Sequence, residues 1–164
     1  AVVRVMPNTP ALIQAGAAAL FANELVSDVQ KELAEAIMRL VGITVWLDDE
    51  DKMDTVTALS GSGPAYFFLQ MEAMENAAVK LGLDEQLARL LTLETAFGAA
   101  KMAMESSHEP AALRKQVTSP GGTTEKALES LMQGDYLGLF EEALQAARDR
   151  SRELADNFSG ESKP

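Results

Sequence analysis

The pattern of hydrophobic and polar positions changes character near residue 48. On the N-terminal side, short apolar runs predict three strands, at residues 2–6, 17–22 and 43–47. Between the last two runs, apolar residues recur every three or four positions. This spacing predicts an amphipathic helix whose apolar face carries Val29, Leu33, Ile37, Leu40 and Val41. Ser27 and Gln30 form a capping box at its start. The order strand, strand, helix, strand is typical of the last part of an α/β sheet.

Beyond residue 48 the pattern is helical throughout. Helices are predicted at residues 51–59, 64–81, 84–106, 109–117, 125–132 and 135–157, and Asp84 is the predicted cap of the third. The helices between residues 63 and 106 are rich in Ala, Met and Leu, and their small residues let helix backbones approach closely. These helices carry more apolar surface than a single chain can bury. We therefore expect a symmetric dimer formed through helix packing. The alternative is an ordinary internal core.

The first residues carry a separate signal. The chain opens without an initiator Met on the apolar run AVVRVM, which is the pattern of a strand in the middle of a buried sheet. We therefore expect the chain to be cut from a longer protein whose N-terminal part is missing. A processed terminus is the alternative interpretation.

Composition narrows the classes of function. The 164 residues, 47% of them hydrophobic and 24% charged, fit one globular domain with room for an appendage. The absence of cysteine excludes disulfides, thiolate nucleophiles and thiolate zinc sites. The single histidine, His108, excludes multi-histidine metal sites, and its polar surroundings predict a surface residue.

Charge and hydropathy argue against two kinds of partner. Fourteen basic and 25 acidic residues give a formal net charge of −11, which repels nucleic-acid phosphates and anionic membranes. Residues 5–23 carry no charge, but they include Pro7, Asn8, Pro10 and Gln14, which a membrane helix would not carry together. We expect a cytoplasmic protein with no nucleic-acid or membrane partner.

The segment SPGGTT at residues 119–124 is the strongest candidate for chemistry. Ser119 suits a helix N-cap and Pro120 the first helical position. The two glycines that follow cost about 1 kcal/mol each in a helix relative to Ala. That cost is explained if bare N–H groups and the hydroxyls of Thr123 and Thr124 bind a carboxylate or phosphate. The alternative is a plain capping motif.

Two other segments give weaker signals. The glycines of SGSGP at residues 60–64 resemble a phosphate loop but lack its third glycine. We therefore favour a helix–helix junction in which Gly61 and Gly63 let two backbones cross and Pro64 starts the second helix. The acidic run at residues 48–51 lacks the spacing of a calcium loop and is typical of a solvated helix start. No metal site is predicted.

Three longer segments together resemble one family: VMPNTPALIQAG at residues 5–16, DTVTALSGSGPAYFF at 54–68 and LRKQVTSPGGTTEKAL at 113–128. Their order and spacing resemble the C-terminal part of pyrroline-5-carboxylate reductase. The resemblance implies a mainly α fold, a helical dimerisation domain of the 6-phosphogluconate-dehydrogenase-like C-terminal type preceded by the last strands and one helix of a Rossmann sheet. The implied parts are a remnant of the dinucleotide-binding domain (1–47), the helical dimerisation and substrate-binding domain (48–158) and a disordered tail (159–164).

The resemblance also implies a reaction. Hydride from NADPH or NADH, bound mainly by a missing N-terminal domain, reduces the C=N bond of Δ1-pyrroline-5-carboxylate and gives L-proline. Thr57 is then the catalytic residue, which orients the ring through its nitrogen or relays a proton from water. The implied substrate-binding residues are Ser119, Gly121, Gly122, Thr123, Thr124 and Glu50. The implied cofactor-binding residues are Met6, Pro7, Asn8 and Gln116.

Assembly and the competing functions follow from the same resemblance. Family members form homodimers and in many cases higher homo-oligomers, so we expect this chain alone to dimerise without reducing substrate. The alternatives are another NAD(P)-dependent reductase of a small carboxylate and a non-catalytic helical dimerisation module. The paired glycines at 121 and 122 distinguish the last of these, because a scaffold has no evident reason to keep them.

Overall fold

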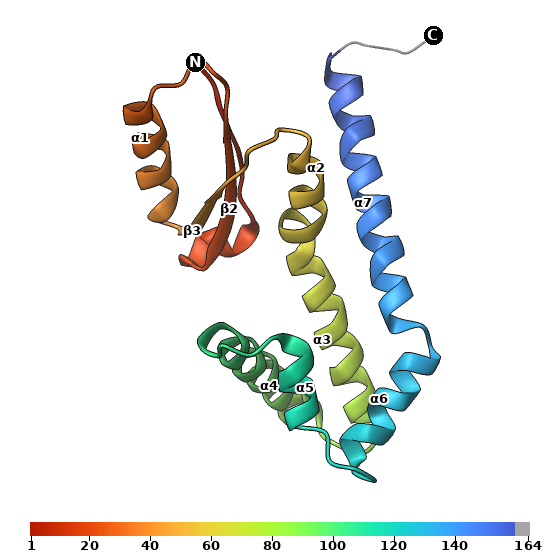
Figure 1. The fold of residues 1–164 in the computed structure, drawn as a ribbon. Coiled ribbons are helices and arrows are strands. Elements are labelled where there is room, and N and C mark those ends of the chain that lie inside the picture. The colour runs from red at the N-terminus through yellow and green to blue at the C-terminus, as the bar shows by residue number, and fades with distance from the viewer. Residues whose placement is uncertain (160–164) are drawn as a thin grey trace. The chain divides into compact units, whose positions relative to one another are not determined.

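The computed structural model describes residues 1–159 and shows a mainly helical chain with a three-stranded sheet (Figure 1). It divides into two compact units. Unit 1 takes residues 1–66 together with the chain from Phe140 onward, and unit 2 takes Phe67–Leu139. The domain limit predicted between residues 47 and 48 coincides with the change from strands to helices, and it does not coincide with the division into these two units. The predicted domains therefore remain a prediction.

The sheet of unit 1 has the order β1-β2-β3. Strand β1 (Val3–Met6) pairs antiparallel with β2 (Gly16–Ala22), and β2 pairs in parallel with β3 (Gly42–Trp46). A short 3₁₀ turn, η1 (Thr9–Ile13), joins β1 to β2. The parallel pair needs a crossover, which helix α1 (Asp28–Arg39) supplies. The predicted strand, strand, helix, strand order is confirmed.

Helix α1 starts at the predicted capping box. The Oγ of Ser27 accepts from the backbone N of Gln30 at 3.4 Å, and Oε1 of Gln30 accepts from the backbone N of Ser27 at 2.9 Å. The helix is held to β3 by Glu35, whose Oε2 accepts from Nε1 of Trp46 at 2.9 Å. Its apolar stripe is largely exposed, at Val29, Leu33, Ile37 and Leu40.

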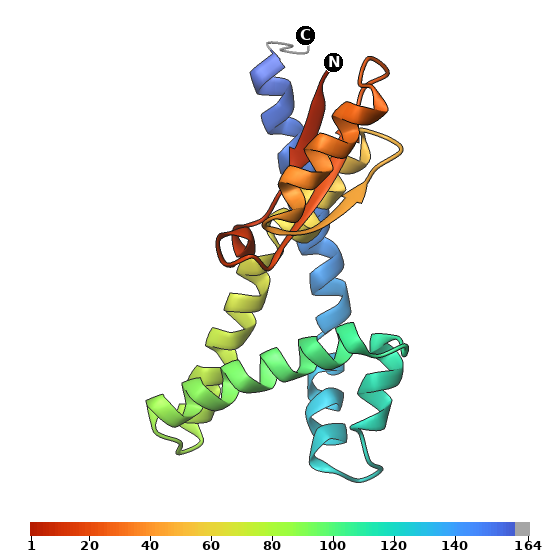
Figure 2. The ribbon, with the colours of Figure 1, turned by 90° about the vertical axis from the view of Figure 1, so that its left-hand side faces the viewer.

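Helix α2 (Lys52–Val56) lies on the opposite side of the sheet from α1, as Figures 1 and 2 both show. The core between α2 and the sheet contains the largest fully buried side chains of the described residues, Leu20 of β2 and Met53 of α2. Helix α7 (Tyr136–Ser159) runs beside α2 in unit 1. It continues through Ser159, the first residue of the predicted tail, and residues 160–164 lie outside the described part.

Between α2 and α3 (Gly63–Lys80) the chain stays helical but changes its hydrogen bonding. Residues Thr57–Gly61 form a single π-helical turn, η2, which we call the π-turn. The predicted helix–helix junction at SGSGP is confirmed, but the predicted crossing of two backbones there is wrong for the described residues. A Cβ added at Gly63 would meet nothing within 4 Å, and one added at Gly61 would meet only side-chain atoms of Met6 and Thr57. Pro64 lies in the first turn of α3, where its missing N–H is not needed.

The regular elements of unit 2 are all helical: the part of α3 from Phe67, then α4 (Glu85–Glu105), α5 (Pro110–Gln116), α6 (Thr123–Gln133) and the first residues of α7. Asp84 caps α4 as predicted, with Oδ1 accepting from the N of Leu87 at 2.9 Å. His108 is exposed, also as predicted. Large apolar residues are exposed as well, at Phe67, Phe68, Leu90, Phe97 and Met104. Within residues 1–159, no helix combines the length and apolarity needed to cross a membrane.

Candidate active site

The carboxyl end of β1 and the π-turn come together in unit 1. Met6 is the last residue of β1, and its Sδ lies 3.4 Å from the point where a Cβ on Gly61 would stand. The Cγ2 of Thr57 lies 3.7 Å from the same point. Because Gly61 has no side chain, the side chains of Met6 and Thr57 can both lie beside it. Two residues assigned to the site from distant segments of the sequence are thus neighbours in the structure.

The hydroxyl of Thr57 has a defined orientation. Its Oγ1 donates to the carbonyl oxygen of Met53 at 2.9 Å, and the residue is half-buried. The hydroxyl proton is therefore already donated to the backbone, and the oxygen can interact with a ligand only as a hydrogen-bond acceptor. A threonine of ordinary acidity is a poor proton donor. The geometry favours Thr57 as a hydrogen-bond acceptor.

Glu50 lies at the same sheet through an ion pair. Its Oε1 is 3.1 Å from Nη1 of Arg4, and both side chains are partly exposed. Arg4 and Met6 are two residues apart on β1, so their side chains leave the same face of the strand. Glu50 thus reaches the face of β1 that carries Met6, although it belongs to the acidic run predicted to be solvated.

Two further acidic residues of that run, Asp48 and Asp49, are paired locally. The carboxylate of Asp48 accepts from the ammonium of Lys52 four residues on, and this hydrogen bond lowers the pKa of Asp48 below its ordinary value. The Oδ1 of Asp49 accepts from the backbone N of Asp51 at 2.9 Å. In the described part of the chain, no three His, Cys, Asp or Glu side chains lie close enough together to hold a metal ion.

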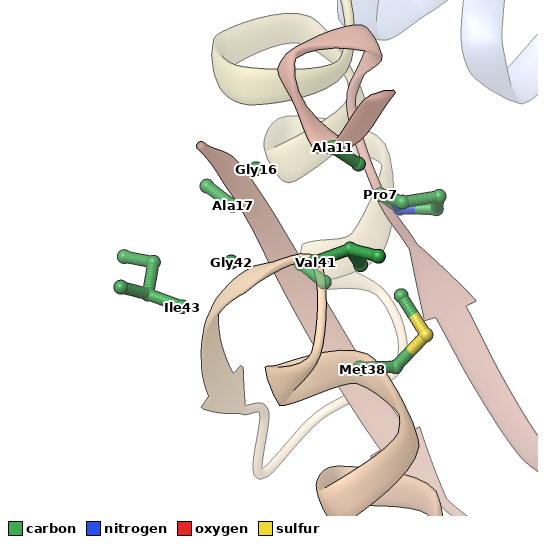
Figure 3. A pocket seen from close by; sticks show the side chains of 9 residues that line it. Pro7, Ala11, Gly16, Ala17, Met38, Val41, Gly42 and Ile43 are labelled. Atoms are coloured by element: carbon green, nitrogen blue, oxygen red, sulfur yellow. The ribbon is translucent and has the colours of Figure 1, made fainter. Parts of the chain in front are cut away.

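Asn8 and Pro7 follow β1 directly. The Oδ1 of Asn8 accepts from the backbone N of Ala17 at 2.9 Å, which holds the turn after β1 against β2. The amino group of Asn8 is then the end that a ligand can approach. Pro7 lines a small pocket with Met38 and Ile43, and apart from the ring nitrogen of Pro7 the side chains around it carry only carbon and sulfur (Figure 3). Without polar groups to orient a ligand, this pocket is not the candidate site.

In unit 2 the segment SPGGTT differs from its prediction. Helix α6 begins at Thr123 with Gly122 at the N-cap, so Ser119 as N-cap and Pro120 as first helical residue are both wrong. A tight turn precedes the helix, closed by a bond of 3.0 Å from Gly122 N to Ser119 O. Gly121 has a φ of +72°, a left-handed conformation that favours glycine.

The paired glycines therefore have a local structural reason. A Cβ on Gly122 would lie 2.5 Å from Oγ of Ser119 and 3.0 Å from its carbonyl oxygen. Gly121 is required by its backbone conformation. A non-catalytic scaffold with this turn would keep both glycines too, so they do not distinguish a binding site from a scaffold.

Part of the expected anion site is already occupied by the chain itself. The Oε2 of Glu125 accepts from the backbone N of Gly121 at 2.7 Å. No side chain of the described residues caps the first turn of α6, which leaves the N–H groups of Thr123 and Thr124 at the helix start. Gln116, the last residue of α5, is exposed in the same unit. The candidate residues are thus divided between the units, with Met6, Pro7, Asn8, Glu50 and Thr57 in unit 1.

Two residues beside the π-turn were missed by sequence reasoning. The hydroxyl of Tyr66 donates to the carbonyl of Ala58 at 3.1 Å, and Oδ1 of Asp54 accepts from Oγ of Ser151 at 2.7 Å. A signal for Tyr66 existed, because a hydroxyl in an otherwise apolar segment needs a partner when it is buried. Asp54 offered none, since its partner is 97 residues away in the chain.

Known proteins resemble this chain over nearly its whole length. Residues 50–154 match the family model described as pyrroline-5-carboxylate reductase dimerisation. A pyrroline-5-carboxylate reductase of Pseudomonas aeruginosa is 57% identical over 157 residues, which cover 96% of this chain and 58% of that protein. The structure of a pyrroline-5-carboxylate reductase from Coxiella burnetii gives a TM-score of 0.89 at 54% identity, covering 93% of this chain and 56% of that one. A Plasmodium falciparum pyrroline carboxylate reductase, solved with NADP bound, gives 0.88 at 34% identity, covering 94% and 63%.

Proposed function

Because the chain belongs to the pyrroline-5-carboxylate reductase family, we propose that the whole protein carrying it reduces Δ1-pyrroline-5-carboxylate to L-proline with NADPH or NADH. The bound nicotinamide supplies the hydride, and residues of this chain hold the ring that receives it. The observation that carries the proposal is the position of Thr57 beside Met6 at the carboxyl end of β1. Open α/β sheets bind their ligands at such strand ends. The chain spans 58% of the Pseudomonas aeruginosa relative, so the activity belongs to the longer protein.

Thr57 orients the substrate ring in this proposal. A cyclic imine accepts hydride at carbon most readily when its nitrogen is protonated, and that N–H then needs an acceptor. The oxygen of Thr57 suits this role, because its own proton is donated to the carbonyl of Met53. The bond fixes the nitrogen, and with it the face of the adjacent carbon.

Met6, Pro7 and Asn8 are the residues that would meet the nicotinamide. The side chain of Met6 suits the flat face of the ring, and the amino group of Asn8 suits its carboxamide oxygen. Pro7, whose ring lies in the apolar pocket with Met38, fixes the backbone between them. Gln116 offers a second amide, from α5. The rest of the cofactor is bound by residues outside this sequence. In this proposal residues 1–47 form the end of the dinucleotide-binding domain and residues 48–158 the helical domain.

The substrate carboxylate is bound by the turn that precedes α6. Ser119 offers a hydroxyl, and Thr123 and Thr124 offer N–H groups at the positive end of the helix dipole. Gly121 and Gly122 allow the turn to form. Glu50 contributes through its ion pair with Arg4, which prevents its charge from repelling the anionic substrate.

We further propose that the protein forms a homodimer, from which higher homo-oligomers can be built, and that it works in the cytoplasm. The exposed apolar residues of α3 and α4 support dimerisation, because large apolar patches on a folded chain mark interaction surfaces. Light scattering of the 164-residue chain at micromolar concentration tests this directly. A stable monomer contradicts it.

The experiment for the reaction compares variants of the whole protein in an assay of NADPH oxidation that depends on pyrroline-5-carboxylate. Thr57→Val removes the acceptor but keeps the shape, and we expect kcat to fall about 100-fold. Thr57→Ser keeps the hydroxyl and should retain most of the activity. Thr55→Val is the matched control, because Thr55 is exposed and lies two residues away on α2.

Each outcome has a defined reading. A wild-type protein that oxidises no NADPH with this substrate, yet dimerises, contradicts the proposed reaction and favours a helical dimerisation module. An active protein in which Thr57→Val behaves like Thr55→Val retains the reaction but removes Thr57 from it.

A further inference from the structure

The π-turn leaves one buried carbonyl without its usual donor. In an α-helix the N–H of Ser62 would bond the carbonyl of Ala58, four residues earlier. Here that N–H donates to the carbonyl of Thr57 instead, at 2.8 Å. Ala58 is 1% exposed, so water does not replace the missing donor. A buried carbonyl in this position needs a partner from elsewhere in the chain.

Tyr66 supplies that partner. Its hydroxyl donates to the carbonyl oxygen of Ala58 at 3.1 Å, from the first turn of α3. The Tyr66 ring is itself held in place by Phe140 of α7, with ring centroids 6.5 Å apart and planes at 82°. This edge-to-face contact fixes the direction in which the hydroxyl points. All three residues belong to unit 1.

The hydrogen bond of Tyr66 decides between two helical registers. If the N–H of Ser62 donated to the carbonyl of Ala58, the π-turn would become an α-helical turn, which contains one residue fewer. One residue in an α-helix corresponds to a rotation of about 100°. Thr57 and Gly61 would then rotate relative to one another, and the arrangement in which Thr57 and Met6 both lie beside Gly61 would be lost. The Tyr66 hydroxyl stabilises the register in which that arrangement exists.

We infer that Tyr66 is a positioning residue for the reduction: its hydroxyl holds the carbonyl of Ala58, maintains the π-turn and so keeps Thr57 directed at the substrate ring. This inference rests on the proposed function, in which Thr57 meets the ring nitrogen. Tyr66 itself touches neither substrate nor cofactor. Its effect is on the chemical step, since a misplaced acceptor lets the ring bind in unproductive orientations.

The test is Tyr66→Phe in the whole protein, which removes the hydroxyl and keeps the ring that packs on Phe140. We expect kcat to fall about ten-fold, and KM for pyrroline-5-carboxylate to change less than about two-fold, because the carboxylate is bound elsewhere. The primary deuterium isotope effect on kcat, measured with deuterated nicotinamide, should rise as hydride transfer becomes slower. A loss of folded protein lowers kcat but leaves that isotope effect unchanged.

Ser60→Ala is the matched control. The Oγ of Ser60 donates to the carbonyl of Val56 at 3.2 Å, so this variant removes a hydroxyl bond in the same turn without touching Ala58. It should keep the isotope effect of the wild type. Amide hydrogen exchange gives a readout that needs no activity: exchange at Ser62 should change in Tyr66→Phe and stay as in the wild type in Ser60→Ala.

The outcomes separate this inference from the proposed function. A wild type without reductase activity contradicts the proposed function, and hydrogen exchange still reports whether Tyr66 holds the π-turn. An active wild type with an unchanged isotope effect and unchanged Ser62 exchange in Tyr66→Phe overturns the inference alone. If Tyr66→Phe does not fold, Phe140→Leu takes its place, because it loosens the ring and keeps the hydroxyl. An unaltered isotope effect in that variant overturns the inference as well.

Discussion

The carboxylate of Asp54 joins the two segments of chain that form unit 1, and its removal has a calculable cost. Its Oδ1 accepts from Oγ of Ser151 at 2.7 Å, and its Oδ2 lies 3.6 Å from Nε of Arg152. A hydrogen bond to a charged group contributes about 1.5–3 kcal/mol. The ion pair adds less than about 1 kcal/mol, since Arg152 is half exposed. We expect Asp54→Ala to lower the free energy of unfolding by about 2–3 kcal/mol.

Urea unfolding measures this cost. All variants are compared at one protein concentration, because dimer formation would make the measured stability depend on concentration. At about 2–4 °C per kcal/mol for a chain of this size, the melting temperature should fall by roughly 4–12 °C. Asp51→Ala is the matched control: it removes the same charge from an exposed side chain three residues earlier and should change stability by less than about 0.5 kcal/mol.

A double-mutant cycle identifies the partner. Combining Asp54→Ala with Ser151→Ala should reveal a coupling energy of about 1–1.5 kcal/mol, since the two side chains are in direct contact. The reasoning is refuted if the coupling is below about 0.3 kcal/mol, or if Asp54→Ala and Asp51→Ala destabilise the protein equally. Either result would mean that α7 is held beside α2 by its apolar contacts alone.

Two further predictions concern strand β3, and Gly63→Ala at the start of α3 is the control for the first of them. A Cβ at Gly42 would lie 1.9 Å from the carbonyl oxygen of Gly16, so Gly42→Ala should cost about 3 kcal/mol in urea unfolding. Gly63→Ala, whose Cβ meets nothing within 4 Å, should change stability by less than about 1 kcal/mol. The indole N–H of Trp46 lowers the pKa of Glu35 below its ordinary 4.5, so this bond stabilises the fold above that pH and is lost as pH falls through the lowered pKa. The fluorescence of Trp46, the chain's single tryptophan, should therefore change with a midpoint below pH 4.5 and lose this transition in Glu35→Gln.

Local signals in the sequence were enough for most of the elements. The capping residues Ser27 and Asp84 and the spacing of apolar positions gave the starts of α1 and α4 correctly. These features act within one or two turns of the chain, so they are readable without a fold. Strand positions followed from β-branched and small apolar runs in the same way.

The start of α6 shows where local signals fail. Ser119 and Pro120 suit a helix start, but the left-handed Gly121 inserts a turn first and moves the helix start to Thr123. A Ser-Pro pair has the same preference for a turn as for a helix N-terminus, and the glycines decide between the two. The carboxylate of Glu125 then stabilises the turn by accepting from the N–H of Gly121. An anion site inferred from the pattern alone ignores this internal competitor.

The candidate site depends on a choice that no local pattern encodes. The apolar pattern predicts helices at residues 51–59 and 64–81, but it does not say how the backbone between them is hydrogen-bonded. The register is decided by Tyr66, whose ring is placed by Phe140, a residue 74 positions further along the chain. The direction of Thr57 is therefore a tertiary property, although Thr57 and Tyr66 lie within one segment of the sequence. It follows that substitutions in α7, which carries no candidate site residue, should alter the chemical step through Phe140 while leaving the binding of the substrate carboxylate intact.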